Sequence, residues 1–335
     1  MEEHILLAHG NGGILTSQLI ENCFLPYFQD PLLKQLNDQA IFELEVHRIA
    51  FTTDSFVVDP LFFPGGDIGK LAVCGTVNDL AVGGATPLYL SVGFIIEENF
   101  PIEELKKISS SISTAAREAR VRIVTADTKV VEKGACDKLF INTSGIGLVT
   151  REVDFSGHNA KRGDKIVLSG DIGDHGIAIL SSRKGIAFET SIKSDCAPLN
   201  LLVDDLLPYG RSIHVVRDLT RGGLATILNE IATQSAIGIT IYEDRIPLKE
   251  EVRGVCELLG LDPLYLANEG KLIAFVHPEG AEEVLSVMKK NPLGENARII
   301  GEVVSTPSEK VTMETHVGGS RLIEMLVGEE LPRIC

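Results

Sequence analysis

Five aspartates stand beside glycines or after expected strands, where their carboxylates could share one ligand. They are Asp54, Asp67, Asp79, Asp127 and Asp218. Several carboxylates that meet in one place repel each other unless a cation lies among them. Mg²⁺ is the suited cation, because it prefers oxygen ligands and usually keeps substrate phosphate among them. A single aspartate beside a glycine is more often a turn or cap residue. Together the five predict one magnesium–nucleotide site better than five unrelated turns.

Two further features could supply donors to the phosphates of a nucleotide. Lys129 lies two residues after Asp127 and is one candidate, although a lone lysine is more often solvated. The run Gly10-Asn11-Gly12-Gly13 offers backbone N–H groups that could form an anion nest. The alternative for this run is a flexible terminus. An acidic protein binds the polyanion ATP only through such donors and a bridging cation.

The other end of the sequence carries a cysteine on an expected tether. Apolar residues in 322–326 predict a last helix that Gly328 ends. Residues 328–335 then form a tail that could extend ~26 Å. Its last residue, Cys335, is expected to be exposed to solvent, where a thiol can react. A chance cysteine in a frayed tail is the alternative.

Composition and missing signatures exclude several functional classes. The 335 residues carry a formal net charge of −16, which argues against a nucleic-acid partner. No G-x-G-x-x-G, H-E-x-x-H or G-x-S-x-G occurs, and Pro64 and Leu71 break the P-loop pattern in PGGDIGKL. No C-x-x-C occurs, so the other five cysteines are expected to be buried thiols. No membrane span or signal peptide is recognisable, and the sequence predicts a cytoplasmic protein without a membrane partner.

Alternating strand-like and helix-like segments must position these side chains. Strands are predicted over 47–53, 88–96, 121–126, 139–149, 165–169 and 272–276, and helices over 67–82, 103–119, 198–207, 224–233 and 281–289. Asp54 and Asp127 each follow a predicted strand. Asp67 is a plausible N-cap for the 67–82 helix, which would place it ~18 Å from Asp79 at the other end. It could therefore cap the helix or hold a second ion.

Two α+β halves are predicted, joined near a polar stretch at 155–163. We expect domains over 1–155 and 156–327, followed by the tail 328–335. Short helices between antiparallel-looking strands favour a layered α+β fold over a doubly wound sheet. The string Asp79-Leu80-x-x-Gly83-Gly84 recurs from Asp218, but one copy is expected to end a helix and the other to precede one. The match is therefore weak evidence of duplication.

Several strings together resemble a known family. The chain is similar to the hydrogenase maturation branch of the PurM-like (AIR synthase-related) family of ATP-dependent synthetases. The strings that carry this resemblance span nearly the whole chain: HGNGG, TTDS, PGGDIGKLAVCGTVNDLAVGGATP, ADTKVV, SGDIGDHGIAI, RDLTRGGLA, ANEGK and PRIC. The terminal Pro-Arg-Ile-Cys is the most specific of them. Asn11 stands where the family pattern has Ser, which leaves only the hydrogen bond of that loop in doubt.

The resemblance implies a fold and a reaction. The fold would be a two-domain PurM-like α+β fold whose N-terminal sheet pairs with its mate in a homodimer barrel. The carbamoyltransferase HypF would load a carbamoyl group onto the sulfur of Cys335. ATP would then drive dehydration of the thiocarboxamide to a thiocyanate. The cyano group would pass through a HypC–HypD complex to the iron of [NiFe]-hydrogenase.

The resemblance also assigns residues. Metal ligands would be Asp54, Asp79, Asp127 and Asp218; phosphate contacts would come from Asn78, Thr128 and Lys129; Gly12, Gly13 and Asp67 would also bind the nucleotide. Cys335 and Lys129 would be catalytic, and Glu269 of ANEGK would be the base or orient the thiocarboxamide nitrogen. A salt bridge from Glu269 to Lys271 is the alternative for that residue. For His175 a structural hydrogen bond is at least as good an interpretation as a catalytic role.

Two other functions compete with this prediction. One is a different PurM-like enzyme, of the selenophosphate synthetase or thiamine-phosphate kinase type, which would not need Cys335. The other is a non-enzymatic thiol carrier in metal-centre assembly, in which the acidic residues are only structural. Turnover of ATP by a protein that lacks the Cys335 thiol would favour the first of these.

Overall fold

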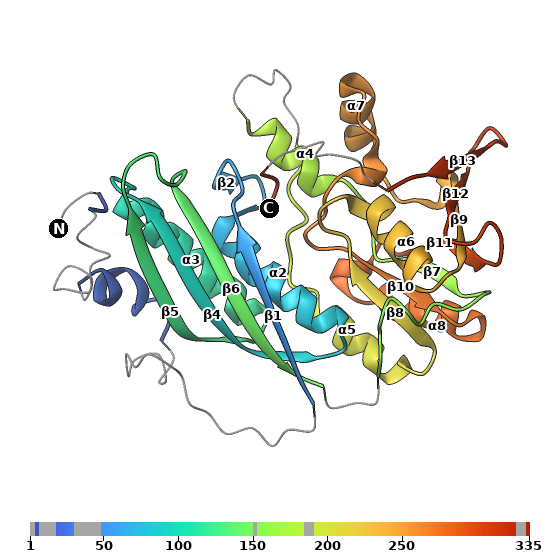
Figure 1. The fold of residues 1–335 in the computed structure, drawn as a ribbon, viewed down its shortest axis with the longest axis horizontal. Coiled ribbons are helices and arrows are strands. Elements are labelled where there is room, and N and C mark those ends of the chain that lie inside the picture. The colour runs from blue at the N-terminus through green and yellow to red at the C-terminus, as the bar shows by residue number, and fades with distance from the viewer. Residues whose placement is uncertain (1–3, 7–17, 30–47, 150–152, 184–190, 326–332) are drawn as a thin grey trace.

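The protein is described by a computed structural model that covers residues 4–6, 18–29, 48–149, 153–183, 191–325 and 333–335 (Figure 1). A four-stranded sheet with the order β1-β6-β4-β5 forms the first half. Its strands are β1 (Ile49–Phe56), β4 (Thr86–Glu97), β5 (Arg122–Val131) and β6 (Leu139–Leu148). β4 and β5 run parallel, and the other two pairs are antiparallel. A short hairpin of β2 (Phe62–Phe63) and β3 (Gly66–Asp67) follows β1.

Two helices cover one face of this sheet (Figure 1). In α3 (Ile102–Glu118) the buried residues recur at helical spacing, as the sequence predicts. By contrast, α2 (Ile68–Val82) is buried on nearly every side because it lies between the sheet and the second half of the chain. Such a helix needs apolar or small residues all round. A π-helical turn, η2 (Ile20–Phe24), packs against α3.

The second half contains a seven-stranded sheet with the order β13-β12-β9-β11-β7-β10-β8. Its strands are β7 (Lys165–Leu168), β8 (Ile213–Asp218), β9 (Gly238–Tyr242), β10 (Leu272–Val276), β11 (Arg298–Val304), β12 (Val311–Glu314) and β13 (Ser320–Ile323). The helices are α4 (Asp174–Ser181), α5 (Asn200–Leu206), α6 (Gly223–Gln234), α7 (Glu250–Leu259) and α8 (Ala281–Met288). Short 3-10 turns connect them: η4 (Leu207–Tyr209), η5 (Glu243–Arg245), η6 (Pro263–Tyr265), η7 (Pro278–Gly280) and η8 (Pro292–Gly294).

Two sequence-based expectations are wrong. The predicted last helix is strand β13, which pairs antiparallel with β12. Leu322 is exposed and Ile323 is buried, an alternation typical of a strand. Asp54 and Asp127 do not follow strands but lie inside β1 and β5, because both strands extend further than their apolar runs.

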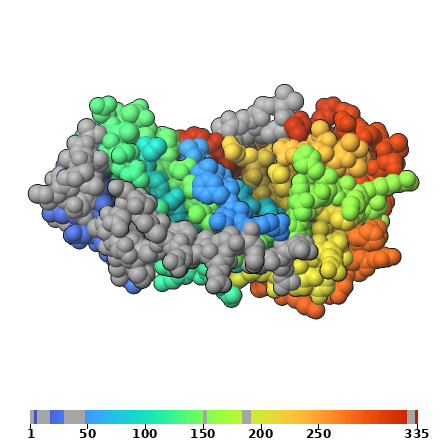
Figure 2. Space-filling model, turned by 60° about the horizontal axis from the view of Figure 1, so that its bottom comes forward, coloured from blue at the N-terminus to red at the C-terminus, as the bar shows by residue number. Residues whose placement is uncertain are grey.

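The two halves adjoin along α2. Ala81 and Val82 of α2 share a buried cluster with Val167 and Leu199 of the second half. Figure 2 shows the blue-to-green first half and the yellow-to-red second half as adjoining lobes of an elongated molecule. No helix among the described residues is long and apolar enough to cross a membrane.

Candidate functional site

Three of the predicted aspartates come together where the two halves meet. Asp54 lies on the face of β1 that packs against α2, Asp79 lies near the end of α2, and Asp218 ends β8. Asp54 and Asp79 lie close enough for each to shift the pKa of the other. The hydroxyl of Thr52 donates to Asp79 Oδ2 at 2.9 Å, and that of Thr76 donates to Asp54 Oδ2 at 3.3 Å.

The pKa values of these three carboxyls are raised. Burial, then the charges of Asp218 and Asp54, raise the pKa of Asp79 to about 7. Burial raises the pKa of Asp218 to about 6, and its Oδ2 has no hydrogen-bond partner among the described residues. Burial also raises the pKa of Asp54, against hydrogen bonds from Thr76 and Asp79 that lower it. The cluster is therefore short of positive charge.

This donor set fits a hard cation. Carboxylate oxygens suit Mg²⁺, and a cation would offset the burial and the repulsion that raise the pKa values. Among the residues that the structure describes, no three His, Cys, Asp or Glu side chains form a ready-made metal site. A cation bound here would thus take some of its ligands from outside the cluster, as Mg²⁺ does when it binds phosphate oxygens.

Within a single protomer, Asp127 and Lys129 lie away from the cluster of Asp54, Asp79 and Asp218. Across the first sheet, Asp127 pairs with Gly93, Gly93 pairs with Asn142, and Asn142 pairs with Ser55. Residues that pair in this way share a face, and successive residues of a strand point to opposite faces. Asp127 therefore lies on the face opposite to Asp54, the neighbour of Ser55. By the same register Lys129 shares the face of Asp127, and both are exposed.

The other residues predicted to bind the nucleotide either contact the protein itself or lie outside the residues that the structure describes. Asp67 caps α2, accepting from the backbone N–H of Gly69 at 2.7 Å and of Lys70 at 3.1 Å. Asn78 accepts from Leu199 N at 2.7 Å, and its amide donates to backbone carbonyls of the second half. Thr128 is half-buried on β5. Gly12 and Gly13 lie outside the described residues.

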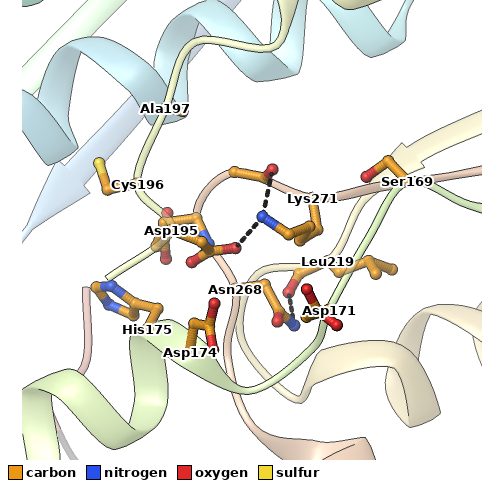
Figure 3. Close-up of polar contacts among 12 residues, drawn as sticks. Ser169, Asp171, Asp174, His175, Asp195, Cys196, Ala197, Leu219, Asn268 and Lys271 are labelled. Carbon is orange, nitrogen blue, oxygen red and sulfur yellow. Dashed lines mark hydrogen bonds and ion pairs between the residues drawn. The ribbon is translucent and has the colours of Figure 1, made fainter. Parts of the chain in front are cut away.

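Glu269 is a buried acid without a compensating cation. Its side chain is 2% exposed, and Oε1 has no hydrogen-bond partner among the described residues. Burial, reinforced by nearby Cys196 and Asp195, raises its pKa well above the usual value. The proposed salt-bridge alternative is wrong, because Lys271 pairs with Asp195 at 3.3 Å (Figure 3). Asp195 Oδ1 also accepts from Glu269 N at 3.0 Å.

The end of the chain is docked rather than free. Val57 N donates to Cys335 O at 3.1 Å, and Asp59 N donates to Arg333 O at 3.2 Å. The tail therefore lies beside residues 57–59, which directly follow β1. Ile334 is 5% exposed in the core of the first half, and Cys335 is half-buried against it. The expectation of a solvent-exposed Cys335 is therefore wrong for this conformation.

Several residues around the tail could not be identified as part of the site from the sequence. Ser194, Asp195 and Cys196 lie on an extended segment outside any helix or strand, where no periodicity marks them. Arg183 donates to the carbonyls of Asp59 and Arg333. No local spacing pattern identifies such residues, because partners such as Glu269 for Asp195 and Arg333 for Arg183 lie 74 and 150 positions away in the chain.

The comparisons with known proteins agree with this geometry. Residues 36–149 match the family "AIR synthase related protein, N-terminal domain", and residues 161–314 match its C-terminal domain. The carbamoyl dehydratase HypE of Bradyrhizobium diazoefficiens is 53% identical over 330 residues, 98% of this chain and 95% of that protein. This chain belongs to the HypE family.

Solved HypE structures confirm the PurM-like fold. A crystal structure of HypE in complex with ATP has a TM-score of 0.95 and 52% identity, covering 98% of this chain and 99% of that one. The HypE chain of a HypE–HypF complex has a TM-score of 0.81 and 50% identity, covering 94% of this chain and all of that one. The hydrogenase-maturation family predicted from the sequence is thereby confirmed.

Proposed function

We propose that this chain is an ATP-dependent carbamoyl dehydratase that acts on its own Cys335 and supplies the cyanide ligand of [NiFe]-hydrogenase. The observation that carries this proposal is the docked tail. It holds Cys335 against a core that also contains Cys74 and Cys196, and Cys196 is a near neighbour of buried Glu269. The names of the HypE relatives and the ATP complex of one of them support the same activity.

The reaction converts a thiocarboxamide and ATP into a thiocyanate, ADP and phosphate. The amide oxygen is a poor leaving group, so it attacks the γ-phosphorus of ATP and displaces ADP. Loss of both N–H protons then allows the C–O bond to break, and phosphate leaves with that oxygen. Glu269 would accept one of these protons, because a buried carboxylate with a raised pKa is a strong base once ionised.

The nucleotide needs charge neutralisation from the acidic cluster. Asp54, Asp79 and Asp218 would hold Mg²⁺, which neutralises phosphate charge when it is bound. We keep the wider assignment as part of the proposal. In it Asp127 is a fourth ligand, and phosphate or nucleotide contacts come from Gly12, Gly13, Asp67, Asn78, Thr128 and Lys129.

The open face of the first sheet supports a homodimer. Its exposed apolar residues include Ile49 (53% exposed), Phe51 (68%) and Ile95 (43%). A second copy that packs on this face would cover them, since apolar surface of this kind favours association. Asp127 and Lys129 share this face, so in the dimer they would serve the nucleotide site of the other protomer.

The proposed reaction requires partners and a moving tail. HypF would load Cys335, and a HypC–HypD complex would accept the cyano group. Cys335 must leave its docked position for both exchanges, so we expect outward and inward tail positions that depend on nucleotide. A reduced thiol is required throughout, which fits a cytoplasmic protein. Structures with and without nucleotide that hold Cys335 in one place would contradict the movement.

Intact-protein mass spectrometry tests the proposed activity. The protein is mixed with ATP, Mg²⁺, carbamoyl phosphate and the carbamoyltransferase, and the chain is weighed over time. We expect a carbamoyl adduct that then loses one water in an ATP-dependent step. Cys335→Ala should form neither species, and Glu269→Gln should form the adduct but lose water at least ~100-fold more slowly.

The same experiment separates the competing functions. A Cys335→Ala protein that still turns ATP over into a small-molecule product would favour another PurM-like enzyme. An adduct that never loses water, in the wild type and with ATP present, would favour a thiol carrier.

A further inference from the structure

His175 is a fully buried side chain whose two ring nitrogens both make hydrogen bonds. It lies in the first turn of α4, 0% exposed, and its ring meets that of Phe63 edge-on, with 5.5 Å between centroids. Nε2 lies 2.8 Å from the carbonyl oxygen of Ile334, and Nδ1 lies 2.8 Å from Ser194 Oγ. Figure 3 shows His175 beside the segment that carries Asp195 and Cys196.

These contacts determine which nitrogen of His175 carries the proton. The Ile334 carbonyl can only accept, so Nε2 must donate to it. Burial lowers the pKa of His175 and keeps the ring neutral. Nδ1 is then an acceptor, and the Ser194 hydroxyl donates to it. Ser194 Oγ in turn accepts from the backbone N–H of Cys196 at 3.0 Å.

The group held by His175 is the peptide unit directly before the reactive cysteine. The Ile334 carbonyl is bonded to the nitrogen of Cys335, so fixing this carbonyl restricts where the sulfur can lie. Other anchors hold the flanking residues: Val57 N holds Cys335 O, while Asp59 N and Arg183 Nη2 hold Arg333 O.

The same chain of hydrogen bonds leads to the proposed base. Ser194 and Cys196 flank Asp195, whose Oδ1 accepts from Glu269 N, and Ala197 N donates to Glu269 O at 3.2 Å. The segment 194–197 therefore contacts the tail through His175 at one end and the backbone of Glu269 at the other. A tail docked on His175 is thus held in register with Glu269.

We propose that His175 is a positioning residue for dehydration: its Nε2–H holds the Ile334 carbonyl, and so the Cys335 sulfur, in the inward position, while the Ser194 hydroxyl donates to Nδ1 and so supports the required tautomer. The inference rests on the proposed function of Cys335. The inference assigns a role to His175, which has no part in the bond-making and bond-breaking steps of the proposed reaction. Loading of Cys335 by the carbamoyltransferase needs the outward tail, so loss of the His175 hydrogen bond should not slow it.

Two measurements on the full-length protein test this role. The first is the rate at which iodoacetamide alkylates Cys335, read from the mass of the peptide that contains it. The second is the single-turnover rate of water loss from the carbamoyl-loaded protein after ATP and Mg²⁺ are added. Loading by the carbamoyltransferase is measured as the internal control.

The variants are His175→Ala, His175→Gln, His175→Asn and Ser194→Ala. Loss of one hydrogen bond should speed alkylation of Cys335 and slow water loss, each by about two- to tenfold, in His175→Ala and His175→Asn. His175→Gln should restore both rates, because its amide N–H reaches about as far as imidazole Nε2. Ser194→Ala should show smaller shifts in the same directions, and loading should be at least as fast as in the wild type in all four.

The outcomes separate this inference from the proposed function. Wild-type alkylation and water-loss rates in a folded His175→Ala protein would overturn the positioning role. Equal behaviour of the Gln and Asn variants would do the same, since only packing would then matter. A wild-type protein that loads but never loses water would overturn the proposed function, while the alkylation rates would still decide whether His175 holds the tail.

Discussion

At the scale of single residues, burial determines the chemistry of the acidic groups. Asp54, Asp79 and Asp218 would be ordinary ionised carboxylates in water, but burial at the junction of the two halves raises their pKa values, and the charges of neighbouring carboxylates raise those of Asp79 and Asp218 further. Glu269 is shifted in the same direction by a drier environment. Some of these buried carboxyls therefore carry a proton at neutral pH, and a bound cation or substrate could displace that proton.

The raised pKa of Asp79 makes a prediction about stability. Without Mg²⁺, the unfolded chain loses this proton near pH 3.8 and the folded protein only near pH 7. The folded state binds more protons between these values, so its stability falls as pH rises through the window. Asp79→Asn removes this penalty, while its amide can still donate to Asp54 and accept from Thr52.

We therefore expect Asp79→Asn to raise the free energy of unfolding by about 1–3 kcal/mol at about pH 8 and to change it little at about pH 4. Urea denaturation at both pH values measures this. Asp127→Asn, on the exposed face of β5, is the matched control and should shift neither value. Equal destabilisation by Asp79→Asn at both pH values would contradict the account.

At the scale of elements, α2 joins the parts of the site. Its first turn is capped by Asp67, and its last turns carry Asn78 and Asp79. The side chain of Asn78 reaches across the junction and bonds the backbone of Ala197 and Leu199 in the second half. A helix buried on nearly all sides can fix its polar ends precisely, because the surrounding core prevents it from rotating or sliding.

The cap of α2 predicts a measurable loss of stability. Asp67→Ala removes the acceptor of two backbone N–H groups and should lower the free energy of unfolding by about 1 kcal/mol. Asp67→Asn keeps an acceptor oxygen and should lose clearly less. Urea denaturation at neutral pH compares the two; equal losses for the Asn and Ala variants would argue that the charge of Asp67 matters more than its capping hydrogen bonds.

At the scale of the whole molecule, the first sheet separates two groups of predicted site residues. Asp54 faces α2, whereas Asp127 and Lys129 lie on the open face with Phe51 and Ile95. In the homodimer that we propose, residues on this face act on the site of the neighbouring protomer. Each site would then be incomplete in an isolated chain.

Mixed dimers test this arrangement. Lys129→Ala and Cys335→Ala homodimers should both be inactive in water loss. A dimer with one subunit of each kind, isolated with two different affinity tags, should regain about half the wild-type rate, because one of its two sites pairs an intact Cys335 with an intact Lys129. A mixed dimer without activity would show that Lys129 acts within its own chain.

The sequence alone determined the family, the α+β class and most elements of regular structure. Glycine punctuation and apolar periodicity are local, so α2 with its Asp67 cap and the stripe of α3 could be predicted. Local patterns gave a wrong prediction where a short apolar run fits a helix and a strand equally well: the predicted last helix is strand β13. They also made β1 and β5 too short, because these strands continue through polar residues.

Tertiary structure alone decided which residues share a site. Sheet register placed Asp127 on the face opposite to Asp54, although both are aspartates within strands of the same sheet. Contacts between residues far apart in the sequence joined His175 to Ile334 and Lys271 to Asp195 rather than to nearby Glu269. Residue types and local spacing indicate which chemistry a side chain is capable of. Burial and strand pairing depend on the whole fold, and they determine which other residues that side chain contacts.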